Sequence, residues 1–209
     1  MTDRDTPDQL RELPLAGIPL ERADARRNRQ RILEAAAELV GERGLAEVTM
    51  DEVAARAGVA KGTVFHRFGN RAGLARALVD QSERELQEAI LRGPPPLGPG
   101  GAPGDRLVAF LGALLELVAD RLDLLLVSDY DHPGQRFETG AYRGWVQHMT
   151  LLLREAGAGP LPVGLAHSLL APLAADLVQH RLRTGATTEE LKAELARLAR
   201  SVLIAKLFT

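Results

Sequence analysis

The chain contains no cysteine and few aromatic residues, which make up only 4% of its 209 residues. The absence of cysteine excludes a disulfide framework and a thiolate metal site, and it fits a reducing compartment such as the cytoplasm. Hydrophobic residues make up 45% of the sequence, which is enough to fill the cores of one or two compact units. Because aromatic residues are few, aliphatic side chains must supply those cores.

The sequence also lacks the pattern of a membrane span or a secretory signal. Residues 1–21 are acidic and contain three prolines but no apolar run, unlike a signal peptide, and we expect them to form a flexible tail. The longest apolar stretch, residues 107–127, is interrupted by four charged residues: Glu116, Asp120, Arg121 and Asp123. We therefore expect no membrane partner and a soluble, cytoplasmic protein.

An overall positive charge is missing as well, since the net charge is -2, and this value alone argues against a nucleic-acid partner. The distribution argues otherwise. Residues 22–76 contain 11 basic and 7 acidic residues, whereas residues 77–209 contain 13 and 16. Phosphate contacts need only a local positive surface. The local excess is compatible with such a surface or with an ordinary solvated, arginine-rich helix.

Residues 49–68 have the pattern of two short helices joined by a tight turn. Thr49 and Glu52 match the capping box that begins a helix, and Gly58 stands where a helix ends in a residue with positive φ. The second helix carries basic and hydrogen-bonding side chains, those of Lys61, Thr63, His66 and Arg67. This arrangement predicts a helix-turn-helix, a motif that binds DNA.

The second of these helices has two distinct faces. Val64 and Phe68 lie on its apolar face, and we expect them in the core. The residues expected to face DNA are Lys61, Gly62, Thr63, Phe65 and His66. They offer an ammonium group, a close backbone approach, a hydroxyl group and two rings to base edges or phosphates. For Phe65, packing in the core is an alternative interpretation.

Two longer helices are predicted to flank the motif, one capped by Asp24 and one capped by Asn70. The predicted helices of this N-terminal domain, residues 22–92, are 25–43, 50–57, 61–67 and 71–92. Residues 93–104 are too rich in proline and glycine to continue a helix, so they predict a linker.

The remaining residues, 105–209, contain no convincing alternating strand pattern and predict a second helical domain. Its expected helices are 105–127, 134–156, 162–183 and 188–207, with an interruption at Pro172. The predicted fold is therefore all-α, with an N-terminal three-helix helix-turn-helix domain and a C-terminal helical domain for ligand binding and dimerisation.

The second domain contains a group of aromatic and polar residues that could line a small-molecule pocket. The candidates are Tyr130, Phe137, Trp145, His148, Met149 and Leu152. The last four share one helical face by their spacing, which plain core packing explains about equally well. The histidines show no metal-ligand spacing, and no nucleophile–base arrangement is visible. We therefore predict no metal, no cofactor and no enzymatic activity.

A stripe of aliphatic residues runs along one face of the last predicted helix: Leu191, Leu195, Leu198 and Val202. Steps of four and three residues are typical of a helix packed along another helix. One helix-turn-helix reads only a few base pairs, so a homodimer on a palindromic operator is expected. The stripe is accordingly predicted to form the dimer interface.

The order Val53-Ala54, Ala57-Gly58-Val59-Ala60-Lys61-Gly62-Thr63-Val64-Phe65 and Phe68, preceded by Thr49 and followed by Arg71 and Leu74, resembles the DNA-binding domain of the TetR (TetR/AcrR) family of transcriptional regulators. The resemblance is specific over residues 26–92. It implies that Lys61, Gly62, Phe65 and His66 meet bases or the adjacent backbone, and that Thr49, Thr63 and Arg71 hold phosphates.

The sequence departs from the family pattern at two positions, Phe65 in place of tyrosine and Ala60 in place of serine, so a phosphate-binding hydroxyl and a helix-capping oxygen are missing. The resemblance implies a ligand-responsive regulator, most often a repressor, that binds a double-stranded operator as a homodimer and is released by a small-molecule effector. The alternative is an all-helical small-molecule-binding or interaction protein with a vestigial DNA-binding domain. Binding to selected DNA duplexes separates the two.

Overall fold

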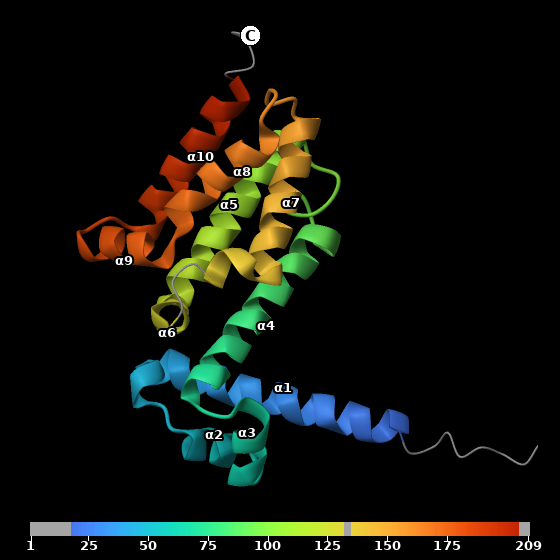
Figure 1. Ribbon diagram of the computed structural model, residues 1–209, viewed down its shortest axis with the longest axis vertical. Coiled ribbons are helices and arrows are strands. Elements are labelled where there is room, and N and C mark those ends of the chain that lie inside the picture. The colour runs from blue at the N-terminus through green and yellow to red at the C-terminus, as the bar shows by residue number, and fades with distance from the viewer. Residues whose placement is uncertain (1–17, 132–134, 205–209) are drawn as a thin grey trace, which may run out of the picture.

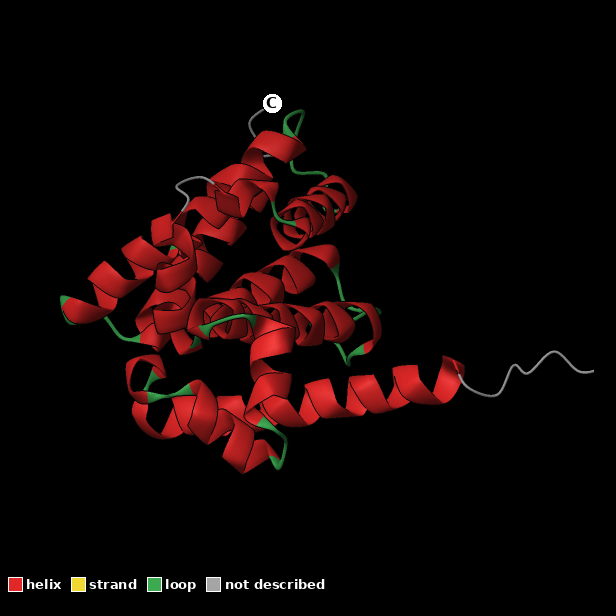
Figure 2. Ribbon diagram, turned by 60° about the horizontal axis from the view of Figure 1, so that its bottom comes forward, coloured by secondary structure: helices red, strands yellow, loops and turns green. Residues whose placement is uncertain are grey.

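The structure is a computed structural model that describes residues 18–131 and 135–204, with side chains described over 24–126 and 137–204. Every regular element within these ranges is a helix (Figure 2). A small three-helix unit lies at one end, and a larger helical bundle lies at the other. The long helix α4 connects the two (Figure 1). The predicted all-α fold with two helical domains is confirmed.

The N-terminal unit contains helices α1 (Ile18–Arg43), α2 (Met50–Ala57) and α3 (Lys61–Phe68), with a short 3-10 turn, η1 (Leu45–Glu47), after α1. Its core is aliphatic and includes Ile32, Leu39, Val53, Val64 and Leu74, each at most 3% exposed. The side chains expected on the inner faces of the helix-turn-helix therefore form this core.

Local capping interactions fix the entry and exit of α2. The backbone N–H of Thr49 donates to Oε2 of Glu52 at 2.9 Å, and the N–H of Glu52 donates to Oγ1 of Thr49 at 3.3 Å. Gly58 ends the helix with φ 64°, a left-handed conformation that glycine adopts without strain. The predicted capping box and glycine turn are both confirmed.

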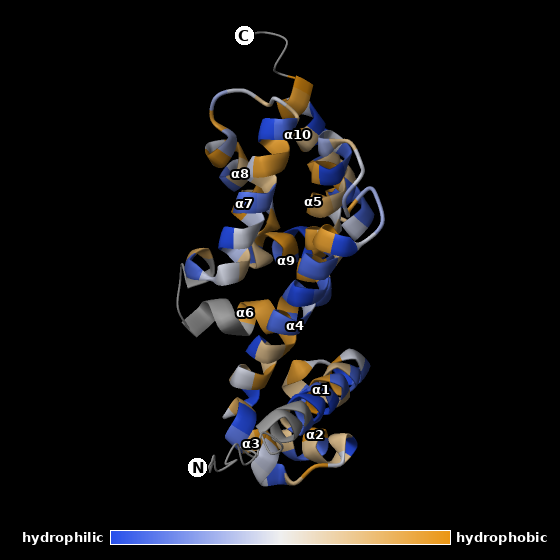
Figure 3. Ribbon diagram, turned by 90° about the vertical axis from the view of Figure 1, so that its right-hand side faces the viewer, coloured by the Kyte–Doolittle hydropathy of each residue, from blue (hydrophilic) through white to orange (hydrophobic). Residues whose placement is uncertain are grey.

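Helix α4 (Arg71–Arg92) begins at Asn70, whose Oδ1 accepts from the N–H of Gly73 at 2.9 Å. A Cβ at Gly73 would lie 2.0 Å from the carbonyl oxygen of Phe68, so only glycine permits this close approach between α3 and α4. Hydrophilic and hydrophobic segments alternate along α4 (Figure 3), as expected for a helix with one buried face. The position of α3 is thus tied directly to α4.

The C-terminal bundle has a core of leucines, together with Phe110 and Trp145, gathered from several helices. Its elements are α5 (Pro103–Asp120), α6 (Leu122–Asp131), η2 (Gln135–Glu138), α7 (Gly140–Glu155), α8 (Pro162–Leu170), η3 (Ala171–Leu173), α9 (Ala175–Arg183) and α10 (Thr188–Ile204). Helix α10 packs along α5. The interruption predicted at Pro172 is present as η3, between α8 and α9.

Several predicted boundaries are wrong. The helix expected from residue 134 is the turn η2 followed by α7, which begins at Gly140. Helix α1 begins at Ile18, so Asp24 lies inside the helix and forms an ion pair with Arg27 one turn later instead of capping it. The helix predicted over 105–127 is divided at Arg121, whose backbone leaves the helical region and whose Nε donates to Oγ of Ser82 at 3.1 Å. That tertiary contact to α4 has no counterpart in the helical periodicity of the sequence.

Candidate nucleic-acid interface and helical-domain cavity

Helix α3 presents a mixed polar and aromatic face to solvent. Lys61, Gly62, Phe65 and His66 are exposed, and Thr63 is half-buried. Phe65 is 40% exposed, so the alternative interpretation of this side chain as a core residue does not hold. Exposed rings and an ammonium group on one helix face can reach base edges in a major groove.

The ammonium group of Lys61 already has partners within the protein. Its Nζ lies 2.6 Å from Oδ2 of Asp51 on α2 and 5.6 Å from the centre of the Phe65 ring. Both members of the ion pair are exposed, so the pair contributes little to stability. These contacts keep the Lys61 side chain near the exposed face of α3, but they are weak enough for it to move to another partner.

Thr49 and Arg71, the two residues expected to hold phosphates from outside α3, are exposed, and both also support the local structure. Thr49 forms the capping box with Glu52. Arg71 donates from Nη1 to the carbonyl oxygen of Ala46 at 2.8 Å, which joins the start of α4 to the turn before α2. Each can present a donor to a phosphate from a fixed backbone position.

Arginine contacts join α1 to the far end of α3. Arg67 donates to the carbonyl oxygen of Ala25 at 3.0 Å, and the guanidinium of Arg29 lies 5.9 Å from the ring centre of Phe68. Burial, followed by the charges of Arg84 and Arg67, lowers the pKa of Arg29. The sequence alone indicated only surface arginines here, because these contacts join residues about 40 positions apart.

Comparison with known protein families finds a match in the N-terminal unit. Residues 32–78 match the family described as bacterial regulatory proteins, tetR family, and this segment contains η1, α2, α3 and the beginning of α4. The capped helix-turn-helix with an exposed recognition face is thus the part with a family signature. The helix-turn-helix unit belongs to the TetR family.

Relatives with known names are transcriptional regulators. The chain is 38% identical over 64 residues to the HTH-type transcriptional regulator BetI of Stenotrophomonas maltophilia, an alignment covering 31% of this chain and 33% of the relative. It is 26% identical over 182 residues to SrpR of Pseudomonas putida, covering 85% and 84% of the two chains.

A solved structure extends the similarity to the whole fold. A TetR/AcrR-family regulator from Thermobifida fusca superposes with a TM-score of 0.62 at 23% identity, covering 83% of this chain and 96% of that one. The level of identity shows a shared fold only. Together with the family match, the named relatives support a DNA-binding transcriptional regulator, as predicted.

The helical domain contains a cavity of about 1110 Å³ between α4, α5, α6, α7 and α8. Its apolar lining includes Leu114, Val118, Trp145 and Leu173. Its polar lining includes Asp80 and Glu83 on α4, together with Tyr142 and His167, whose Oη and Nδ1 lie 2.9 Å apart. A cavity of this size and mixed lining can enclose a small organic molecule.

The predicted pocket residues divide into two groups. Phe137 and Trp145 line the cavity, whereas His148, Met149 and Leu152 do not. Met149 and Leu152 are fully buried in the core, so core packing is the correct interpretation of that part of the stripe. Tyr130 lies outside the residues whose side chains the structure describes.

His148 is packed inside the domain and faces the ring of Phe110, with ring centres 5.1 Å apart in an edge-on arrangement. Burial, and secondarily the charge of Arg106, lowers the pKa of His148 to about 4. Its Nε2 is buried without a hydrogen-bond partner among the described residues. His148 is thus a half-buried residue beside the core, and its lowered pKa keeps the ring neutral at ordinary pH.

The cavity also contains residues that the sequence did not single out. Asp80, Glu83, Tyr142 and His167 come from three helices, and no local motif joins them. Desolvation, and secondarily the charge of Asp80, raises the pKa of Glu83 to about 7. The sequence offers one signal for this part of the cavity, which is the pair of carboxylates Asp80 and Glu83 on the same face of α4.

The structure corrects part of the predicted dimer stripe. Leu191 and Leu195 are 7% and 5% exposed and belong to the core of their own domain, where α10 packs along α5. They are therefore not available to a second chain. Val202 is half-buried, and Leu198 is 42% exposed.

Helix α6 connects the core of the N-terminal unit with the cavity. Leu124 is 2% exposed and belongs to the buried cluster that contains Ile32 and Leu39 of α1. The next residue, Leu125, lines the cavity. A change in the shape of the cavity can thus reach the DNA-binding unit through α6 as well as through α4.

Within the described part of the chain, no three or more histidine or acidic side chains gather as metal ligands would. In the same ranges, no helix combines the length and apolar character needed to cross a bilayer.

Proposed function

We propose that this protein is a ligand-responsive repressor that binds a palindromic operator as a homodimer in the cytoplasm and is shifted or released by a small molecule. The observation that carries the proposal is the double role of α4. Its first turn packs against the end of α3, where Gly73 lies close to the carbonyl oxygen of Phe68, while Asp80, Glu83 and Ile90 further along the same helix line the cavity.

The coupling requires that the ligand bind two conformations of the protein with different affinities. A ligand that fills the cavity presses on α4 and on Leu125 of α6. Both helices contact the N-terminal core, α4 through Leu74 and Leu78, and α6 through Leu124. A displacement of these helices would change the separation of the two recognition helices in a dimer, and therefore their fit to two half-sites.

Exposed apolar side chains on the bundle support the homodimer. Val163 of α8 and Leu198 and Ile204 of α10 are 46%, 42% and 57% exposed. Helices α8 and α10 contact each other, so these side chains belong to neighbouring helices at one side of the bundle. Such a surface suits a four-helix interface made from two copies of the pair.

The test begins with selection of bound sequences from random duplex DNA by the full chain. We expect a palindromic consensus. In gel-shift titrations on that consensus, Lys61→Ala and His66→Ala should each reduce discrimination by about 1–3 kcal/mol if they contact bases. Arg71→Ala should weaken binding to all duplexes and flatten its salt dependence.

Failure to enrich any duplex would support the alternative of a helical binding protein with a vestigial DNA-binding unit. A reporter gene placed behind the selected operator then tests repression. Expression should fall when the protein is present and recover when a cavity ligand is added.

A further inference from the structure

The walls of the cavity are chemically unequal. Helix α4 contributes the carboxylates of Asp80 and Glu83, whereas η2 and α7 contribute the rings of Phe137, Tyr142 and Trp145. The rings of Phe137 and Tyr142 meet edge-on with centres 5.1 Å apart. A site that combines carboxylates with aromatic faces suits a cation, because both attract positive charge.

The surroundings of Glu83 on this wall disfavour the ionised form of its carboxyl group. It is half-buried, and no described residue forms an ion pair with it. Loss of solvent, with the neighbouring Asp80, raises its pKa to about 7. A partly buried carboxylate of this kind gains from any positive charge placed beside it.

The basic residues of the cavity supply that charge only in part. Arg76 and Arg84 are exposed, which places them at the edge of the cavity. Arg84 donates to Oε1 of Gln81 at 3.3 Å, and its charge lowers the pKa of Glu83 less than burial and Asp80 raise it. The remaining titratable groups that line the cavity are Glu138 on η2, Tyr142 on α7 and His167 on α8.

We propose that the cavity takes an organic cation with bulky apolar groups, its charge beside Glu83 and Asp80 and its apolar groups against Trp145 and the leucines of α5. This inference rests on the proposed function in that it assigns the chemical class of the effector to the same cavity. It also predicts that the bound cation favours the ionised form of Glu83. In the fraction of the protein in which Glu83 is protonated, this side chain should therefore release its proton when the complex forms.

The chain carries its own probe, because Trp145 is its single tryptophan and lines the cavity. The experiment follows the fluorescence of Trp145 in the full-length protein during titration with tetraphenylphosphonium and with tetraphenylborate. These ions have the same shape and opposite charge. We expect the cation to bind at least about tenfold more tightly, a difference typical of one partly desolvated charge contact.

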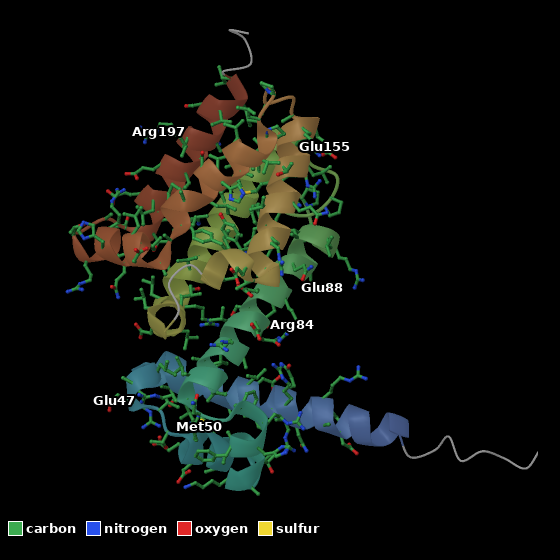
Figure 4. The ribbon with its side chains drawn as sticks, viewed as in Figure 1. Glu47, Met50, Arg84, Glu88, Glu155 and Arg197 are labelled. Atoms are coloured by element: carbon green, nitrogen blue, oxygen red, sulfur yellow. The ribbon has the colours of Figure 1, made fainter. Side chains whose placement is uncertain are left out.

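Variants locate the charge that is responsible. Glu83→Gln keeps the shape of the side chain and should reduce cation affinity roughly tenfold, and Asp80→Asn is a second, independent variant of the same wall. Glu88→Gln is the matched control, since Glu88 lies on α4 near Arg84 (Figure 4), is exposed, pairs with Arg92 and does not line the cavity. It should leave the affinity unchanged.

The pH dependence separates a charge contact from a merely structural role. As Glu83 ionises around pH 7, cation affinity of the unmodified protein should rise with pH between about 6 and 8, and Glu83→Gln should flatten this rise. Equal affinity for the two ions, or no difference between Glu83→Gln and Glu88→Gln, overturns the assignment of a cationic ligand.

Gel shifts with both ions distinguish this inference from the proposed function. If both ions release DNA equally, the effector response holds and the cationic class is wrong. If the cation binds selectively but DNA stays bound, the cationic class holds and this cavity does not control DNA binding.

Discussion

The Nζ of Lys61 lies 2.6 Å from Oδ2 of Asp51, so the first residue of the recognition helix is paired with the first turn of α2. Both side chains are more than half exposed. The pair can therefore open at little cost when Lys61 meets a base or a phosphate. The carboxylate of Asp51 then stays behind, close to the surface that would face the duplex.

We predict that Asp51→Asn raises affinity for all duplexes several-fold, because it removes a negative charge from the DNA-facing surface and frees Lys61. The gain in overall affinity should exceed any gain in discrimination between operator and random DNA, because Asp51 itself is not expected to contact a base. Salt-dependent gel shifts on operator and random DNA provide the measurement.

The control for this charge change is Glu155→Gln, at the end of α7 in the bundle, far from the N-terminal unit (Figure 4). It changes the net charge by the same amount and should leave affinity unchanged. If both variants raise affinity equally, the overall charge is responsible and the Asp51–Lys61 pair is not.

The N-terminal unit could be predicted from the sequence because its determinants are local. The Thr49–Glu52 box, the left-handed Gly58 and the Asn70 cap each involve residues at most four positions from their partners. The exposed and buried faces of α3 follow from helical periodicity alone. The first turns of α1, the short turn η1 and the contacts between α1 and the end of α3 were missed.

The second domain was harder to predict for physical reasons that its residues illustrate. Leu191 and Leu195 have the spacing of a packed helix, but this spacing does not tell whether the partner helix belongs to the same chain or to another. Glu83 and Tyr142 meet at one cavity although 59 positions separate them. Such sites depend on how helices pack, which no local pattern specifies.

The revised interface leads to a prediction with opposite outcomes at two neighbouring positions of α10. Leu198→Glu should convert a dimer into a monomer with little loss of monomer stability, because Leu198 is exposed. Leu195→Glu should instead lower the free energy of unfolding by more than about 3 kcal/mol, because it buries a charge in the core.

Sedimentation at micromolar concentration and urea denaturation distinguish the two effects. A monomeric unmodified protein would contradict the proposed homodimer. If Leu198→Glu sediments like the unmodified dimer, the interface lies elsewhere on the bundle.

Leu124 provides a test of the path between cavity and DNA. Leu124→Ala should leave ligand-dependent quenching of Trp145 in place but weaken the release of DNA, because the side chain links α6 to the N-terminal core. The truncation should also lower stability by about 2–4 kcal/mol. Gel shifts with and without ligand, below the unfolding temperature, measure the coupling.

Leu151→Ala is the matched control, since Leu151 is 51% exposed on α7 and lies outside both cores. It should change neither coupling nor stability. If Leu124→Ala releases DNA as well as the unmodified protein does, the coupling between the cavity and the DNA-binding unit does not run through α6, and α4 carries it.

His148 makes the bundle sensitive to acid. Its pKa is near 4 in the folded protein instead of 6.5, chiefly because burial disfavours the charged ring. As pH falls below 6.5, the unfolded chain gains a proton that the folded chain does not accept until pH is near 4. The stability that the neutral ring provides is therefore present above pH 6.5 and declines as pH falls toward 4.

We expect this decline to amount to about 1–2 kcal/mol, reduced from the full shift because the ring is only partly desolvated. His148→Leu removes the titrating group and should make the free energy of unfolding less dependent on pH in this window, as measured by urea denaturation at several pH values. Carboxylates titrate equally in both proteins, so only the difference between them reports on His148. Parallel pH profiles would mean that the ring accepts a proton in the folded state, and that the pocket beside Phe110 and Arg106 is wetter than its packing indicates.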